Sequence, residues 1–326
     1  MTASTTRLLS PEEIAVRAGN EPAFLRLPDP TVLFAERELR LRQLAAGHAM
    51  RDYLLFTAEL SRAQQEAALQ SKPPVPEAAV FERAAERIEP PLPASGWTRD
   101  ASWREDLRTV LRRLAPELPG TAKQVVTGLV GATDQRLDEQ ADRLLNGVMV
   151  GLDLATAPLI AAGLQVHFSC LVATSSQARA DVRGGAFGRV SDATICPCCG
   201  SRPVASILRF GSEITGQRYL HCTLCQAEWH MVRIKCAHCE SLQGISYQQV
   251  ELAAREGEAA PAAVRAECCD RCGHYLKLVA MDKDPNVEPV ADDLATVALD
   301  LLVSDSGLTR HGVNLLLLYG EGDSPG

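Results

Sequence analysis

Residues 196–199 read CPCC, and the same Cys-x-x-Cys spacing returns at residues 222–225 (CTLC), 236–239 (CAHC) and 269–272 (CDRC). Two residues between cysteines allow a tight turn, here called a knuckle, that aims two thiolates and several backbone N–H groups at one point. Two knuckles supply four sulfurs in a tetrahedral arrangement, so four knuckles predict two four-cysteine metal sites. The predicted ligands are Cys196, Cys199, Cys222, Cys225, Cys236, Cys239, Cys269 and Cys272.

The four knuckles can combine in two ways. Sequential pairing joins the first with the second and the third with the fourth, and each unit is then a ribbon of knuckle, hairpin and knuckle. The alternative cross-braces the first with the third and the second with the fourth, and the ten residues between Cys225 and Cys236 suffice for either scheme. We favour sequential pairing because each half then carries its own hairpin. Four thiolates suit either zinc or iron, and spacing alone does not choose between them.

Other cysteines and histidines lie near the knuckles. Cys198 lies inside the first knuckle and Cys268 beside the fourth, and we expect both to be spare thiols because each has a complete pair next to it. Cys170, in an apolar segment, is expected in the core. Since eight cysteines are already in place, we expect the nearby histidines around the sites or at the surface rather than on the metal. They are His221, His230, His238 and His274.

The composition argues against several classes of function. The 326-residue chain is 46% hydrophobic, and its formal charge of −8 argues against broad nucleic-acid or anionic-membrane binding. Between Cys196 and Cys272, eight Lys and Arg balance eight Asp and Glu, so this region has no basic surface for nucleic acid. The N-terminus lacks a basic region followed by an apolar run. We therefore expect no signal peptide, and metal-binding cysteines in a reducing cytoplasm.

The N-terminal half predicts helices. Residues 31–70 contain no proline and one glycine, Gly47, and their apolar residues recur at helical spacing. They predict one helix of about 60 Å with a bend near Gly47. Ser10 and Pro11 predict the start of a short helix before it. Further helices are predicted at 76–88, 103–115, 121–130, 134–146 and 152–174.

The apolar segment at 154–174 needs a membrane test, because roughly 20 residues suffice to span a bilayer. Gln165, His167 and Ser169 interrupt the segment, and Asp153 precedes it without flanking Lys or Arg. We expect a buried core helix at the centre of a bundle, and no membrane insertion.

The cysteine-rich region predicts short strands. Their expected ranges are 204–210, 217–221, 228–234, 244–250 and 275–280. Such small ribbons have too little core to fold alone, and metal binding supplies roughly 10–16 kcal/mol towards folding. Beyond Pro285 a helix is predicted at 289–303, with three aspartates on its solvent side: Asp292, Asp293 and Asp300. A last apolar run at 313–319 precedes a tail that we expect to be disordered.

These patterns predict a multidomain α+β protein. An all-α domain (1–190) comes first, and two small β metal modules of the zinc-ribbon type (191–235 and 236–285) follow it. A C-terminal helix and tail (286–326) complete the chain.

Five segments, read in order, resemble a known family: CPCCGSRPVAS, RYLHCTLCQAEWH, VRIKCAHCES, CCDRCGHYLK and DPNVEPVADDLATVALDLL. Over residues 194–317 the chain resembles the formate dehydrogenase accessory protein FdhE family, and the helical half resembles it more loosely. The resemblance implies two rubredoxin-like modules, an association with iron, and a cytoplasmic protein that binds the catalytic subunit of respiratory formate dehydrogenase and is needed for its activity. The eight knuckle cysteines carry over one by one. Cys198 and Cys268 do not, and Asn314-Leu315 stands where the family has Asn-Pro.

Three classes of function follow. The first, which we favour, is a non-catalytic, chaperone-like accessory protein that binds formate dehydrogenase during maturation, because the chain offers rigid metal modules and no substrate motif. The second is a rubredoxin-like electron carrier, and the third a zinc-ribbon nucleic-acid-binding protein. We expect two metal ions per chain, with iron favoured by the resemblance and zinc as the alternative, and leave the oligomeric state open. The expected partner surface includes Trp229, His230, Arg233 and Tyr275.

Overall fold

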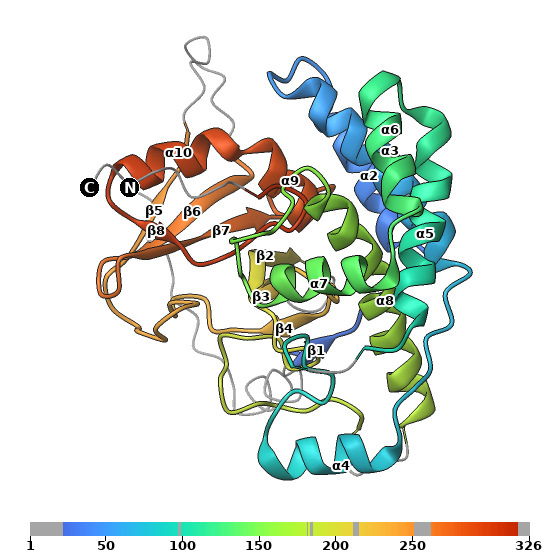
Figure 1. The fold of residues 1–326 in the computed structure, drawn as a ribbon. Coiled ribbons are helices and arrows are strands. Elements are labelled where there is room, and N and C mark those ends of the chain that lie inside the picture. Colours follow the sequence, from blue (N-terminus) through green and yellow to red (C-terminus); the bar gives the residue numbers. More distant parts are fainter. Residues whose placement is uncertain are drawn as a thin grey trace, which may run out of the picture.

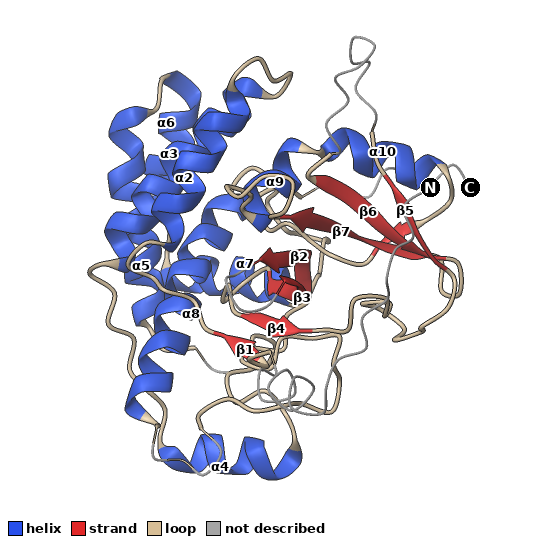
Figure 2. Ribbon diagram, turned by 180° about the vertical axis from the view of Figure 1, so that it is seen from behind, coloured by secondary structure: helices blue, strands red, loops and turns tan. Residues whose placement is uncertain are grey.

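The structure, a computed structural model, describes residues 22–96, 99–180, 182, 185–210, 215–250 and 262–318. Helices gather on one side of the molecule and a mixed β-sheet on the other, with two C-terminal helices beside the sheet (Figures 1 and 2). A helical N-terminal region followed by a sheet with two four-cysteine groups is the α+β arrangement that the sequence predicts. The predicted helix start at Ser10 and the predicted tail lie outside the described residues.

The first two helices correct a prediction. α2 (Leu33–Ala45) and α3 (Arg51–Ala68) fold back on each other and do not form one long helix. The chain turns at Gly47, whose φ of 71° lies in the left-handed region that glycine adopts most readily. Near the end of α3, the side-chain oxygen of Gln65 accepts a hydrogen bond from the backbone N–H of Phe34 (3.1 Å). The antiparallel hairpin thus satisfies a donor at the start of α2 that has no partner within its own helix.

A buried helix forms the centre of the helical half. α8 (Ala157–Ala178) is long and apolar enough to cross a membrane, but 83% of its most apolar window is buried inside the molecule, as expected for a core helix. Gln64 of α3 donates to the carbonyl of Ala162 (3.0 Å), so the two helices are joined by a buried hydrogen bond. The other helices agree with the predicted ranges to within a few residues. They are α4 (Ala78–Arg87), α5 (Ser102–Leu114) with its 3-10 turn η1 (Ala115–Glu117), α6 (Gly120–Val130) and α7 (Asp134–Leu145).

One sheet runs through the cysteine-rich region. Among the described residues its strand order is β1-β4-β3-β2-β7-β6-β5, and β8 pairs with β7. β2 and β3 form the hairpin between the first two knuckles, and β5 and β6 pair between the last two. β2 and β7 then pair in parallel, with Ser206 opposite Leu278, so both ribbons share one sheet.

Four strands lie close to their predicted ranges and β4 is shorter than expected, but the sequence patterns did not predict β1, β6 or β8, and β1 lies within the region expected to be all-α. The bounds are β1 (Leu25–Arg26), β2 (Pro203–Phe210), β3 (Thr215–Cys222), β4 (Glu228–His230), β5 (Ile245–Gln248), β6 (Val264–Cys269), β7 (His274–Ala280) and β8 (Thr309–Arg310).

The C-terminal helices correct a second prediction. α9 (Pro289–Ala295) and α10 (Val297–Asp305) replace one expected helix, and the aspartates expected in solvent are buried: Asp292, Asp293 and Asp300. Lys277 Nζ lies 2.6 Å from an oxygen of Asp300, and an Arg40 nitrogen lies 2.6 Å from Asp292. Leu301 in the same segment is 62% exposed although it is apolar. The cations come from distant segments, so the periodicity of the helix alone assigns its faces wrongly.

Candidate metal centres

Each knuckle is built in the same way. The residue after its second cysteine has a positive φ in all four cases: Gly200 (71°), Gln226 (65°), Glu240 (58°) and Gly273 (69°). This left-handed residue closes the turn, and backbone N–H groups then point at sulfur. The N–H of Leu224 donates to Cys222 Sγ (3.3 Å), and that of His238 to Cys236 Sγ (3.4 Å). Because non-glycine residues adopt this conformation at a cost of about 1–2 kcal/mol, the surrounding structure must hold Gln226 and Glu240 in place.

The eight sulfurs fall into two groups, each formed by consecutive knuckles as favoured from the sequence, and within each group the sulfurs lie within 4.8 Å of one another. A tetrahedral ion with metal–sulfur bonds of ~2.3 Å places its sulfurs about 3.8 Å apart, whereas a disulfide needs about 2.05 Å. The measured distances therefore suit metal ions and do not suit disulfides. They are 3.5 and 3.4 Å in the first group (Cys196–Cys225, Cys199–Cys222) and 3.7 and 3.8 Å in the second (Cys236–Cys272, Cys239–Cys269).

The first group is enclosed by the molecule. Its four cysteines are each at most 1% exposed and belong to the same apolar cluster as the core helices. The helical half holds the turns directly, since Gln165 of α8 donates to the carbonyl of Thr223 (2.9 Å) and the N–H of Leu92 donates to the carbonyl of Cys198 (3.1 Å). An ion bound here would join the helical half to the sheet, the role of a closed structural site.

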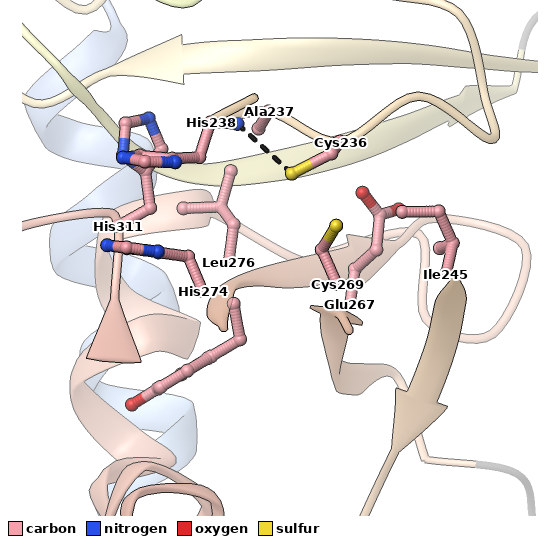
Figure 3. Close-up of a pocket in the computed structure, with 10 residues that line it drawn as sticks. Cys236, Ala237, His238, Ile245, Glu267, Cys269, His274, Leu276 and His311 are labelled. Atoms are coloured by element: carbon pink, nitrogen blue, oxygen red, sulfur yellow. Dashed lines mark hydrogen bonds between the residues drawn. The ribbon is translucent and has the colours of Figure 1, made fainter. Parts of the chain in front are cut away.

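The second group is partly open to solvent. Cys236 and Cys269 are 5% and 1% exposed, whereas Cys239 is exposed and Cys272 is half-buried. Figure 3 shows the sulfurs of Cys236 and Cys269 directed towards a common space beside a small pocket. An ion bound here would be within reach of chelators and of partner proteins.

The buried thiols of the first group cannot all ionise without a cation. Burial raises the pKa of Cys222 and Cys225 well above its usual value, and hydrogen bonding with Cys196 raises it further. Burial also opposes ionisation of Cys196, but the S–H groups of Cys198 and Cys199 donate to it and hold its pKa well below the usual range. Ionisation of Cys196 is thus favoured over ionisation of Cys222 or Cys225. A divalent ion supplies the positive charge that stabilises four thiolates, so the donor set fits a metal.

The histidine at the second knuckle is already engaged. His221 Nδ1 lies 3.1 Å from Glu228, and Nε2 lies 3.1 Å from the side-chain oxygen of Gln226, so both ring nitrogens have partners. Burial alone would raise the pKa of Glu228, but the hydrogen bond from His221 and the charge of Arg209 outweigh it and lower the pKa to about 2. His221 therefore supports the turn at Gln226 and is not free to bind an ion.

The spare cysteines are all buried. Cys198 and Cys268 are fully buried, and Cys170 on α8 is 4% exposed, as expected for a core residue. Burial raises the pKa of both Cys170 and Cys268 to about 11. These two thiols are therefore neutral near pH 7 and pack as small apolar side chains.

Two of the four residues expected on a partner surface lie in the interior, which corrects that prediction. Trp229 is 1% exposed and donates its indole N–H to the carbonyl of Ala193 (2.9 Å). Tyr275 is 2% exposed and donates its hydroxyl to Asp300 (3.0 Å). His230 is half-buried and Arg233 is exposed. The two aromatic rings find their polar partners in distant segments, which sequence spacing does not reveal.

Sequence reasoning missed one histidine next to the second group. His311 lies 4.9 Å from His238 between ring centroids and is 5% exposed. Its backbone N–H donates to the carbonyl of Tyr275 (2.9 Å), so pairing beside β7 brings it there. Burial lowers the pKa of His311 to about 4, and the nearby His238 and Arg202 contribute to the shift. No local spacing connects this residue to the knuckles.

Comparisons with known proteins agree with this architecture over most of the chain. Family models for FdhE match in three consecutive parts, described as N-terminal (residues 22–183), central domain (195–233) and C-terminal domain (234–317). A Protein FdhE homolog from Cronobacter sakazakii is 37% identical over 292 residues, 89% of this chain and 90% of its own. Protein FdhE from Salmonella arizonae is 35% identical over 292 residues, which are again 89% of this chain and 90% of its own.

A solved structure is similar as well. The crystal structure of the FdhE protein from Pseudomonas aeruginosa matches with a TM-score of 0.75 and 34% identity, and the match covers 91% of this chain and 100% of that chain. The three domain models match in order, the relatives are more than 30% identical over most of both chains, and the solved structure shares the fold. The chain therefore belongs to the FdhE family.

Proposed function

We propose that this protein is a non-catalytic accessory protein that binds the catalytic subunit of formate dehydrogenase in the cytoplasm during its maturation. Membership of the FdhE family supports the proposal through the family's name and the resemblance described above. The observation that carries it is the pair of four-cysteine groups, which leave no coordination position for a substrate, and of which the second holds surface turns at fixed angles. Fixed surfaces lose little conformational entropy when a partner binds.

Each four-cysteine group binds one metal ion in this proposal, with the eight knuckle cysteines as ligands. The ion supplies the positive charge that four thiolates need, and it fastens two turns together. Iron is our choice on the family resemblance, and zinc is the alternative with the same tetrahedral sulfur preference. The stretches 191–235 and 236–285 are then two ribbons, each organised around its own ion.

The partner surface lies on the connector between the second and third knuckles. Val232 and Ile234 are 53% and 59% exposed, and Arg233 between them is exposed too. The connector leads directly into Cys236, so an ion in the second group fixes its end. Two apolar side chains beside a guanidinium suit a partner segment that carries apolar and acidic residues.

The test is co-purification of a tagged catalytic subunit with the full chain, together with metal analysis of each variant. The wild type should be retained, and Cys236→Ser/Cys239→Ser should lose one ion and most of the binding, since the connector loses its anchor. Val232→Asp/Ile234→Asp should lose binding while keeping both ions.

The matched control is Leu69→Asp, at a residue 62% exposed after α3, which should bind like the wild type. Normal retention of Val232→Asp/Ile234→Asp would remove the connector from the proposal. Failure of the wild type to bind the subunit, or normal formate dehydrogenase activity in cells without this protein, would contradict the proposal itself.

A rubredoxin-like electron carrier is the second candidate, and the exposure of Cys239 favours it. An iron ion ligated by an exposed thiolate is accessible to an external electron donor. Iron-loaded protein should then show a visible absorption band that bleaches on reduction and recovers on oxidation. Turnover with a donor and an acceptor distinguishes this role from binding alone.

A further inference from the structure

Three imidazole rings gather beside the second four-cysteine group. His238 and His274 stack with ring centroids 3.7 Å apart, and His311 meets His238 edge-on at 4.9 Å. His238 belongs to the third knuckle, His274 begins β7, and His311 follows β8. Figure 3 shows the three rings grouped near Leu276. Three segments that are distant in the sequence thus converge on one cluster.

Among the described residues, both ring nitrogens of His311 lack hydrogen-bond partners, and one nitrogen of His274 is free to bind a ligand. His311 is 5% exposed, and neither of its nitrogens has a hydrogen-bond partner among the described residues. A buried polar atom left unpaired costs about 1–3 kcal/mol, so two on one ring require a cause. His274 Nδ1 lies 2.8 Å from the carbonyl oxygen of Cys272. Nδ1 therefore carries the proton, and Nε2 keeps a lone pair available for a ligand.

A sulfur of the second group faces the same space. The donor atoms of His238, Cys272 and His274 lie within 4.8 Å of one another. Small side-chain rotations bring atoms at that separation to the ~2.0–2.3 Å bonds of a transition-metal ion. Imidazole nitrogen with thiolate sulfur is a donor set that suits zinc, cobalt or nickel and does not suit magnesium or calcium.

We propose that His238, His274 and Cys272 bind a third, divalent transition-metal ion next to the ring of His311. The sulfur of Cys272 then bridges this ion to the ion of the second four-cysteine group, so the proposal rests on that group holding a metal. His311 borders this site, and its unpaired nitrogens have no other partner among the described residues.

The surroundings make this third ion exchangeable. The stacked rings of His238 and His274 are 8° from parallel, so one ring must turn for both to reach one ion. His238 is exposed and has room to turn, whereas the first four-cysteine group is enclosed. The third ion is therefore held at the surface, where it can be loaded and released without unfolding the sheet.

The experiment counts metal ions in the full chain, prepared without a polyhistidine tag. Anaerobic protein is incubated with excess Co²⁺ or Zn²⁺, freed of unbound ion by gel filtration, and measured by elemental analysis. The wild type should carry three ions per chain. His238→Ala and His274→Ala should carry two, and the matched control His230→Ala, at a half-buried histidine outside the cluster, should keep three.

A cobalt titration gives a second readout. The third equivalent should change the absorption spectrum of the wild type, and this change should be missing in His238→Ala. His238 is exposed, so this variant should fold even if a change at the buried His311 does not.

Each outcome bears on the proposal separately. Two ions in the wild type would overturn the third site and leave the two four-cysteine groups intact. Three ions in His238→Ala would overturn the assignment of these ligands. Fewer than two ions in the wild type would contradict the metal sites of the proposed function as well.

Discussion

At the scale of single residues, Lys277 joins the sheet to the C-terminal helices. Its side chain is fully buried on β7, and its Nζ lies 2.6 Å from Asp300 and 3.3 Å from Asp293. Arg310 approaches the same two carboxylates, at 2.6 Å from Asp293 and 3.2 Å from Asp300. Burial opposes ionisation of Asp293, but Arg310 and Lys277 outweigh it and lower its pKa. Two cations and two carboxylates therefore balance in the interior.

Replacing the buried cation should be strongly destabilising. Lys277→Met leaves two buried carboxylates facing one guanidinium, and breaking a buried pair in this way costs roughly 3–5 kcal/mol. The measurement is the free energy of urea unfolding of metal-loaded protein. The control is Lys283→Met, which removes a partly exposed pair with Asp282 (3.4 Å) and should cost less than about 1 kcal/mol. Similar losses in both variants would contradict this account of the buried charges.

At the scale of elements, helix α8 depends on a close crossing with α5. A Cβ added at Gly163 would lie 2.6 Å from Leu107 Cβ and 2.7 Å from its Cα. The second of these atoms belongs to the backbone and cannot rotate away. Glycine is needed here for the approach of two helices, although it is a poor helix former.

Gly163→Ala should therefore destabilise the helical half by roughly 1–3 kcal/mol, the usual cost of overpacking a core. Gly128→Ala on α6 is the matched control, because no described atom lies within 4 Å of a Cβ there and its φ is not positive. Alanine at that position should raise stability by up to about 1 kcal/mol through helix propensity. The measurement is the thermal unfolding midpoint of each variant, monitored by circular dichroism. Equal changes in stability for Gly163→Ala and Gly128→Ala would mean that α5 and α8 can move apart to accept the added methyl group.

At the scale of the whole molecule, the two four-cysteine groups share a sheet but differ in their surroundings. The first lies in the core that the sheet forms with the helices, and the second lies near the edge with one exposed cysteine. The parallel pairing of β2 with β7 joins them, so the second ribbon can loosen while the first stays packed.

In protein that carries only the two ions of the four-cysteine groups, metal release should therefore occur in two phases. A chromogenic chelator should remove the ion of the second group quickly, because Cys239 is exposed, and that of the first group slowly, because local unfolding must precede access. Cys269→Ser should abolish the fast phase and Cys222→Ser the slow one. A single phase in the wild type, or the reverse assignment in the variants, would show that burial does not control release.

Much of the candidate site follows from local sequence. Each knuckle depends on residues within a few positions of its cysteines, and the left-handed residue after each pair comes directly next in the chain. Sequential pairing also follows, because each hairpin lies between the two knuckles that it joins. The helices at Trp103 and Asp134 were predictable for the same reason, since amphipathic spacing is a property of neighbouring residues, and the helix at Ala157 was predictable from the length of its apolar run.

Contacts between distant segments determine the features that local sequence does not predict. Residues 31–70 form a hairpin because folding back at Gly47 buries two helices against each other, a gain that no window of local sequence records. The aspartates of α9 and α10 face inward because Lys277, Arg310 and Arg40 approach from elsewhere and neutralise them. His311 reaches the knuckles through strand pairing. Local spacing specifies turns and helices, whereas burial and charge compensation depend on which segments meet, and only the tertiary structure determines that.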